Sequence, residues 1–107
     1  MTTYTPDKFV VHDYGASYEE ERYAILGGWW GNFITPDSWK RSSPIVRWEL
    51  QDDSTIIAHT YSGSQYRLTK ELEGVTMLTQ SLIIQASLAV IDEWEEIMKI
   101  AKENSDV

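Results

Sequence analysis

The chain has 107 residues, the size of one domain, and carries a formal net charge of −8. This excess of acid argues against direct binding to nucleic acid, because contacts with a phosphate backbone need clustered Lys and Arg. The lack of cysteine excludes disulfides, thiolate nucleophiles and Cys-based zinc sites. The longest apolar run, 82–91, is too short to span a bilayer, and the N-terminus lacks the features of a signal peptide. We therefore expect a cytoplasmic protein that does not associate with membranes.

The first third of the chain predicts short elements. Residues 1–8 read as a polar tail, and 9–12 as a short strand. Ser17 is a candidate helix N-cap with Glu20 three residues later, which favours a short helix or turn before a strand at 23–26. Further on, a loop that contains Pro36 is expected to lead into one helical turn.

That helical turn is expected to begin at Asp37 or Ser38 and to run through Trp39. Before it, Gly27, Gly28 and Gly31 bracket two tryptophans. Glycines at such positions favour a kinked or bulged strand pair that admits close neighbours.

The middle of the chain predicts a β-meander. Residues 45–50 alternate with period two, 55–61 form a second β-rich run, and 65–69 form a third. The turn between the second and third runs contains Gly63, which suits a left-handed backbone position. Three successive antiparallel strands are therefore expected.

After Gly74 the apolar spacing changes to that of a helix. We expect one long helix over 76–103, capped by Thr76 or Thr79. The whole chain, 1–107, is then a single α+β domain with a β-rich core at 22–69. Its antiparallel sheet of about four or five strands is covered on one face by the long C-terminal helix.

Catalytic and metal-binding signatures are missing from the sequence. His12 and Asp13 are adjacent, so their side chains do not point at each other as a catalytic pair would. No spacing typical of a zinc site, a P-loop or a nucleophile elbow occurs. We expect no catalytic residue, no metal and no cofactor, and a protein that is not an enzyme.

Aromatic and acidic residues are the candidates for binding another protein. The chain has five Trp and six Tyr, residue types that are favoured in interfaces. The carboxylates around Trp94 fall opposite the apolar stripe of the predicted helix, where they either form a solvated face or dock on a basic groove. The candidate anchors and charged residues are Trp29, Trp30, Trp39, Asp92, Glu93, Glu95 and Glu96.

A second set of residues suits a small ligand. Arg47 and Arg67 lie on predicted strands of one sheet, and Arg41 belongs to the basic spot at 40–41. Arginines can hold a phosphate in bidentate fashion while an aromatic ring such as that of Tyr66 stacks on a base. The alternative is a solvated loop together with cross-strand ion pairs with Glu49 and its neighbours.

Between Gly27 and Leu68 the chain resembles small uncharacterised proteins carried by bacteriophages and mobile elements. In those proteins a glycine-aromatic-glycine start is followed by a serine-rich strand and a T-x-S-G-S-x-Y-x-L hairpin. The matching residues are Gly28, Trp30, Gly31, Ser42, Ser43, Ile45, Thr60, Ser62, Gly63, Ser64, Tyr66 and Leu68. The resemblance implies an origin in such elements and no particular activity.

Small size, acidity, aromatic content and the missing catalytic set together favour a non-enzymatic protein that binds and inhibits a host protein with a basic surface. An anti-defence or anti-CRISPR factor is the type we expect, acting in the host cytoplasm. One alternative is a binder that sequesters a nucleotide-like molecule. The other is a structural homodimer built on the wide apolar face of the predicted helix.

Overall fold

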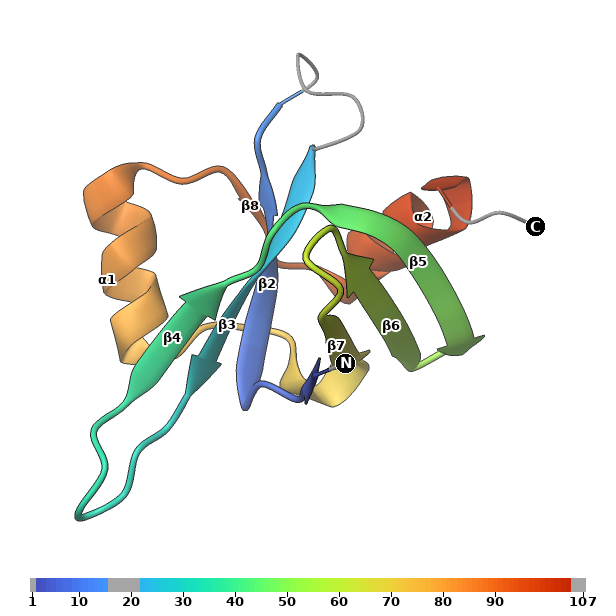
Figure 1. Cartoon of the computed structure of the whole chain (residues 1–107). Coiled ribbons are helices and arrows are strands. Elements are labelled where there is room, and N and C mark those ends of the chain that lie inside the picture. Colours follow the sequence, from blue (N-terminus) through green and yellow to red (C-terminus); the bar gives the residue numbers. More distant parts are fainter. Residues whose placement is uncertain (1, 16–21, 105–107) are drawn as a thin grey trace.

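The computed structural model describes residues 2–15 and 22–104, where two four-stranded sheets and two helices form an α+β fold (Figure 1). The predicted N-cap Ser17 and its partner Glu20 lie outside the described residues. The strands are β1 (Thr3–Tyr4), β2 (Lys8–Asp13), β3 (Tyr23–Trp29), β4 (Ser38–Arg41), β5 (Ile45–Asp52), β6 (Thr55–Thr60), β7 (Gln65–Thr69) and β8 (Val90–Ile91). The helices are α1 (Met77–Ala86) and α2 (Trp94–Asn104), and a short 3₁₀ helix, η2, spans Lys70–Leu72.

The predicted meander is confirmed. Strands β5, β6 and β7 pair antiparallel in sequence order, and β1 adds to β7 in parallel, in the order β1-β7-β6-β5; we call this the meander sheet. Gly63, in the turn between β6 and β7, has a φ of 94°, a left-handed conformation that favours glycine. Strand β1 lies within the segment expected to be a polar tail, and Pro6 in the same segment is buried.

The second sheet has the order β4-β3-β2-β8, and we call it the hairpin sheet. Strand β4 is the segment for which a helical turn was predicted, so that prediction is wrong. Trp39 pairs with Gly28, and Arg41 pairs with Leu26. Residues 38–41 are extended because they pair with β3. The prediction was wrong because it used only neighbouring residues in sequence, which carry no information about pairing with a distant strand.

The C-terminal region contains two helices instead of the single helix expected over 76–103. Thr76 caps α1 as predicted, since its hydroxyl accepts from the Thr79 N–H and the Thr79 hydroxyl accepts from the Thr76 N–H. Helix α1 ends where Ser87 adopts a left-handed φ of 51° and the N–H of Leu88 donates to the carbonyl of Ile83. Strand β8 then pairs with β2 before α2 begins.

One apolar core lies between the two sheets. Phe9, Val11 and Ile25 of the hairpin sheet meet Trp48, Ile56, Tyr66 and Leu68 of the meander sheet. Helix α2 joins them on one stripe with the helical spacing i, i+3, i+4, i+7, formed by Trp94, Ile97, Met98 and Ala101.

Helix α1 lies on the other side of the hairpin sheet. A Cβ atom built on Gly28 of β3 would meet the Thr76 hydroxyl oxygen at 2.8 Å, so glycine at this position lets the helix N-terminus approach the sheet. Thr79 is the one fully buried residue of α1. The helix therefore uses a small part of its surface to contact the rest of the fold.

The chain passes from one sheet to the other at Ser42, directly after β4. The Ser42 hydroxyl accepts a hydrogen bond from the N–H of Ile25 at 2.8 Å and donates to the carbonyl of Ser43. Both Ser42 and Ile25 are buried. Because a buried N–H must find a partner, this side chain satisfies a group that the departing strand would otherwise leave unpaired.

We expect Ser42→Ala to destabilise the protein by about 1–3 kcal/mol, since the buried Ile25 N–H loses its acceptor. Urea unfolding at neutral pH measures this change. The matched control is Ser81→Ala on the exposed face of α1, expected to stay within about 0.5 kcal/mol of the parent. Equal unfolding midpoints for the two variants would show that the Ser42 hydroxyl does not stabilise the crossing.

Candidate functional site

The loop between β3 and β4 projects from one end of the molecule (Figure 1). We call residues 30–37 the hairpin tip. Phe33 and Ile34 are 104% and 90% exposed, and Trp30 is 55% exposed. Large apolar side chains at such exposure on a projecting loop mark a candidate interaction surface.

Hydrogen bonds inside the tip fix its shape. The side-chain carbonyl of Asn32 accepts from the N–H groups of Ile34 and Thr35, both at 2.8 Å, and the N–H of Asn32 donates to the Thr35 carbonyl. At the base of the tip, Asp37 accepts from the Gly31 N–H. The turn therefore holds Phe33 and Ile34 outward without contacts from the rest of the protein.

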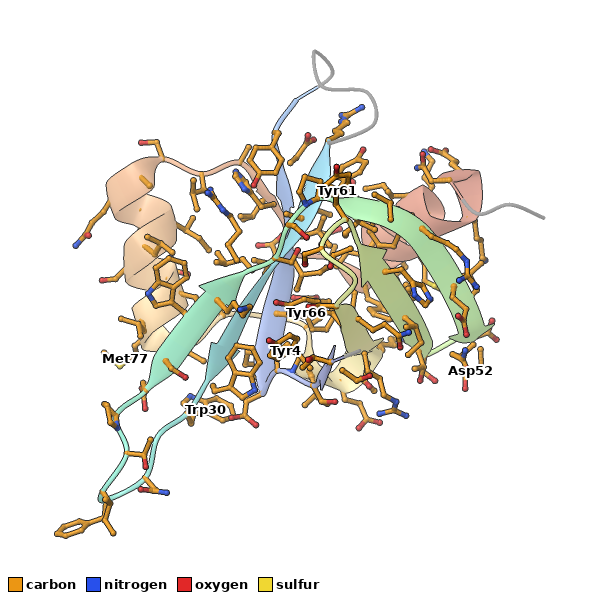
Figure 2. The ribbon with its side chains drawn as sticks, viewed as in Figure 1. Tyr4, Trp30, Asp52, Tyr61, Tyr66 and Met77 are labelled. Atoms are coloured by element: carbon orange, nitrogen blue, oxygen red, sulfur yellow. The ribbon has the colours of Figure 1, made fainter. Side chains whose placement is uncertain are left out.

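Exposed apolar residues are concentrated on this side of the molecule. Among the described residues, seven of the nine exposed large apolar side chains belong to the tip, β4 or α1: Trp30, Phe33, Ile34, Trp39, Met77, Leu78 and Ile84. Figure 2 shows Trp30 and Met77 on the side of the projecting hairpin and Asp52 on the opposite side. We call this region the apolar side of the protein.

The three predicted tryptophan anchors have different surroundings. Trp30 and Trp39 are exposed on the apolar side, at 55% and 44%. Trp29 is partly buried and packs against the core, with its ring 6.2 Å from that of Tyr4 in an edge-on arrangement. The sequence missed Phe33 and Ile34, because an isolated Phe-Ile pair reads as core unless its exposure is known.

The predicted acidic residues lie apart from the tryptophans. Asp92, Glu93, Glu95 and Glu96 are all exposed at the start of α2, which lies at the other end of the molecule from the hairpin tip (Figure 1). Two of them lie in the first turn of α2, where negative charge is favourable for the helix dipole. The structure therefore does not gather the predicted anchors and the predicted acids into one patch.

Charge is divided between the two halves of the fold. Residues 42–74 and 92–104, which contain β5 to β7 and α2, carry ten acidic and five basic side chains. The described residues of the hairpin sheet and α1 carry three acidic and four basic side chains, and none of these lies between 75 and 91. The apolar side is thus nearly neutral in an acidic protein.

The four residues predicted for a phosphate-bearing ligand are not brought together. Arg41 is on the hairpin sheet, with its guanidinium 5.6 Å from the centre of the Tyr14 ring. Arg47 on the meander sheet pairs with Glu49 at 3.2 Å, two residues along the same strand β5, whereas the ion-pair alternative expected partners across strands. Tyr66 is fully buried, and burial raises the pKa of its hydroxyl to about 12. Arg67 points to the opposite face of β7 from Tyr66, since neighbouring strand residues alternate.

The two histidines have separate structural surroundings. Asp13 forms an ion pair with Arg22 at 3.1 Å, which lowers the pKa of its carboxyl group, and the ring of His12 packs against Tyr14 instead. His59 contacts Glu49 at 2.9 Å on the outer face of the meander sheet. The carboxylate of Asp13 is therefore directed to Arg22 and not to the imidazole of its neighbour His12.

Serine and threonine residues between 43 and 64 meet in one hydroxyl cluster. Ser43 accepts from the Ser62 N–H and donates to the Ser62 hydroxyl, both at 3.0 Å. The Thr60 hydroxyl donates to the carbonyl of Ser64 at 2.9 Å. These bonds tie the β6–β7 turn to the start of β5, so the cluster shows how these loops are joined.

A hollow of about 460 Å³ lies beside α2, away from the apolar side. Trp94 and Met98 contribute its apolar lining, and the Trp94 indole N–H donates to the carbonyl of Asp53. Its charged lining consists of three acidic and three basic side chains. Because these charges balance, the lining favours neither a cationic nor an anionic ligand.

Within residues 2–15 and 22–104, no group of three or more His, Asp or Glu side chains could hold a metal ion. Neither helix in this part of the chain has the length and apolar character needed to cross a membrane. Comparisons with protein-family models, curated proteins and solved structures gave no match.

We expect the protein to lose stability as the pH falls below about 6.5. Burial, with a further contribution from the Arg41 charge, lowers the pKa of His12 below its ordinary value of 6.5. The unfolded chain therefore binds this proton at a higher pH than the folded chain, and unfolding is favoured as the pH drops through that range. Urea midpoints at about pH 7.5 and about pH 5.5 measure the loss.

His12→Phe is the variant that tests the cause, because phenylalanine fills the site and does not titrate. Its midpoint should fall less between the two pH values than that of the parent protein. A fall of the same size would assign the pH dependence to other groups. Glu73, whose pKa burial raises, changes stability in the opposite direction and does so in both proteins.

Proposed function

We propose that the chain is a non-enzymatic protein of phage or mobile-element type that binds and inhibits a host protein, and that it docks through the hairpin tip. The observation that carries this proposal is the outward presentation of Trp30, Phe33 and Ile34 on a projecting loop. Removal of such side chains from water by a partner favours binding by about 25 cal/mol per Å² of apolar area buried.

The rigidity of the tip supports a binding role. Its turn is held by Asn32 and Asp37, and the N–H of Trp30 donates to the Asp7 carboxylate at 2.9 Å. A preorganised loop loses little conformational entropy when it binds. A small cluster of aromatic and aliphatic anchors is the usual energetic centre of a protein interface.

The charge division supports a basic partner. The half that contains α2 has an excess of acid, and the candidate acids Asp92, Glu93, Glu95 and Glu96 are exposed. Their field would attract a basic protein and increase the rate of association, while the nearly neutral tip makes the close contact. The two predicted sets of residues would then act at different steps of the same association.

A binder of nucleotide-like ligands has less support. Its proposed aromatic platform, Tyr66, is inside the core, and Arg47 already has a carboxylate partner. Because Tyr66 is buried and Arg47 is paired, these two side chains do not form one surface that could hold a base and a phosphate together.

We expect the double variant Phe33→Ser and Ile34→Ser to bind the host partner at least about tenfold more weakly, since two anchors are lost. The measurement is affinity capture from host lysate, followed by titration of the captured protein. The matched control is Val46→Ser with Tyr61→Ser, which removes two apolar side chains of 56% and 76% exposure from the meander sheet. Equal affinity of the two double variants would refute docking through the tip.

We expect the fourfold variant Asp92→Asn, Glu93→Gln, Glu95→Gln and Glu96→Gln to bind the same partner more slowly and with a flatter dependence on salt. Neutral isosteres remove the long-range attraction and keep the shape of the surface. Association rates at low and high ionic strength measure the effect. An unchanged salt dependence would mean that these four acids form only a solvated face.

A further inference from the structure

Strand β4 is an open edge of the hairpin sheet. All four of its residues, Ser38–Arg41, are exposed, and within the described residues β4 pairs with β3 alone. Its register with β3 is regular over its whole length. An exposed and regular edge strand is a template for pairing with another strand.

The other three edges are less suited to this role. Strands β1 and β8 contain two residues each. Strand β5 is longer, but its register with β6 shifts at two places, and Arg47 and Glu49 project from it. Bulges and charges of this kind protect an edge from pairing, so β4 stands out as the available one.

The hydrogen bonds at Ser42 show which backbone groups of β4 point outward. The N–H of Ser42 donates to the Ile25 carbonyl at 2.8 Å, so Ser42 faces β3. Backbone groups alternate along an antiparallel strand, and therefore Lys40 also faces β3. Trp39 and Arg41 direct their N–H and carbonyl groups to the open edge.

We propose that a second copy of this chain pairs with the open edge of β4 in antiparallel register, with Trp39 opposite Trp39 of the second copy. The two hairpin sheets then become one eight-stranded sheet related by a two-fold axis. In this register Asp37 of each copy lies opposite Arg41 of the other, so the interface contains two opposite-charge pairs.

Charge selects this register over the one in which Trp39 lies opposite Arg41 of the second copy. Backbone groups that point outward must meet each other, so the pairing can shift only in steps that keep Trp39 and Arg41 in contact with outward residues. The next such step places Lys40 directly opposite Lys40 of the second copy, and like charges in that position are destabilising. Arg41 has no ion-pair partner within the described residues. Its guanidinium lies 5.6 Å from the centre of the Tyr14 ring, so this exposed side chain has to turn toward the open edge to pair with Asp37 of the second copy.

The distribution of charge over the whole molecule favours the same edge. Two copies, each with a net charge of −8, repel one another. The hairpin sheet and α1 form the half with three acidic and four basic side chains, so pairing at β4 keeps the two acidic halves apart. A dimer would also present two hairpin tips, which increases the apparent affinity for a partner that offers two sites.

This inference does not depend on the proposed function, because it concerns the backbone edge of β4 and is tested on the purified protein alone. Sedimentation velocity should give a species of about twice the 12.4 kDa chain mass. Asp37→Arg and Arg41→Asp should each raise the dissociation constant of the dimer at least about tenfold. Each variant puts like charges at positions 37 and 41, and the two-fold axis brings these positions together at two places in the interface.

Mixing the two single variants provides the decisive control. In a mixed pair, arginines at positions 37 and 41 of one copy face aspartates at positions 41 and 37 of the other, so a heterodimer should form. Asp37→Arg also removes the hydrogen bond to the Gly31 N–H, and mixing restores the charges without restoring that bond. A monomeric parent protein, or single variants that do not recover on mixing, would overturn the proposal.

A cross-link tests the register directly, because the chain has no cysteine of its own. Two residues in a hydrogen-bonded antiparallel pair have Cα atoms about 5.5 Å apart, a separation that a disulfide can span. Trp39→Cys should therefore give a covalent dimer under mild oxidation, and the control Tyr61→Cys, at an exposed position in the turn after β6, should not. Equal yields from the two variants would count against pairing through β4.

Discussion

Burial of backbone groups at the crossing between the two sheets is the constraint on which the rest of the fold depends. The chain leaves the hairpin sheet after β4 and enters the meander sheet at β5, so the N–H of Ile25 loses the strand that would have paired with it. The Ser42 hydroxyl replaces that partner at 2.8 Å. With this group satisfied, Ile25 and Ile45 can both lie in the shared core, and the two sheets can face each other across it.

The same crossing gives a structural role to the serine and threonine residues of the pattern found in the sequence. Ser42 and Ser43 lie at the crossing, and Thr60, Ser62 and Ser64 surround the β6–β7 turn that packs beside it. The hydroxyls bond to one another and to backbone groups, so each side chain contributes to joining two loops. A pattern of this kind specifies a scaffold. Of the side chains proposed for binding, Trp30 belongs to the pattern, whereas Phe33 and Ile34 lie outside it.

The sequence predicted those parts of the fold that depend on local signals. The meander followed from period-two alternation and from Gly63, and the start of α1 followed from Thr76 and Thr79. The end of α1 was missed because Ser87 takes the left-handed position that glycine usually marks, and β4 was missed because its conformation depends on β3. The exposure of Trp30 and Trp39 was left open by the sequence, and no local signal distinguishes an exposed Phe33 from a core residue.

The separation of apolar and acidic surfaces limits how the protein can associate. The acidic half has ten acidic and five basic side chains, so an interface there would have to offset part of this negative excess with partner cations. The apolar side can be covered without removing any large excess of charge from water. Close contacts are therefore expected around the hairpin tip and β4, and long-range attraction is expected from α2. The tip is proposed to bind a host partner through the side chains of Trp30, Phe33 and Ile34. Pairing at β4 uses the backbone of Trp39 and Arg41 and the charges of Asp37 and Arg41, so a host partner and a second copy need not compete for the same atoms.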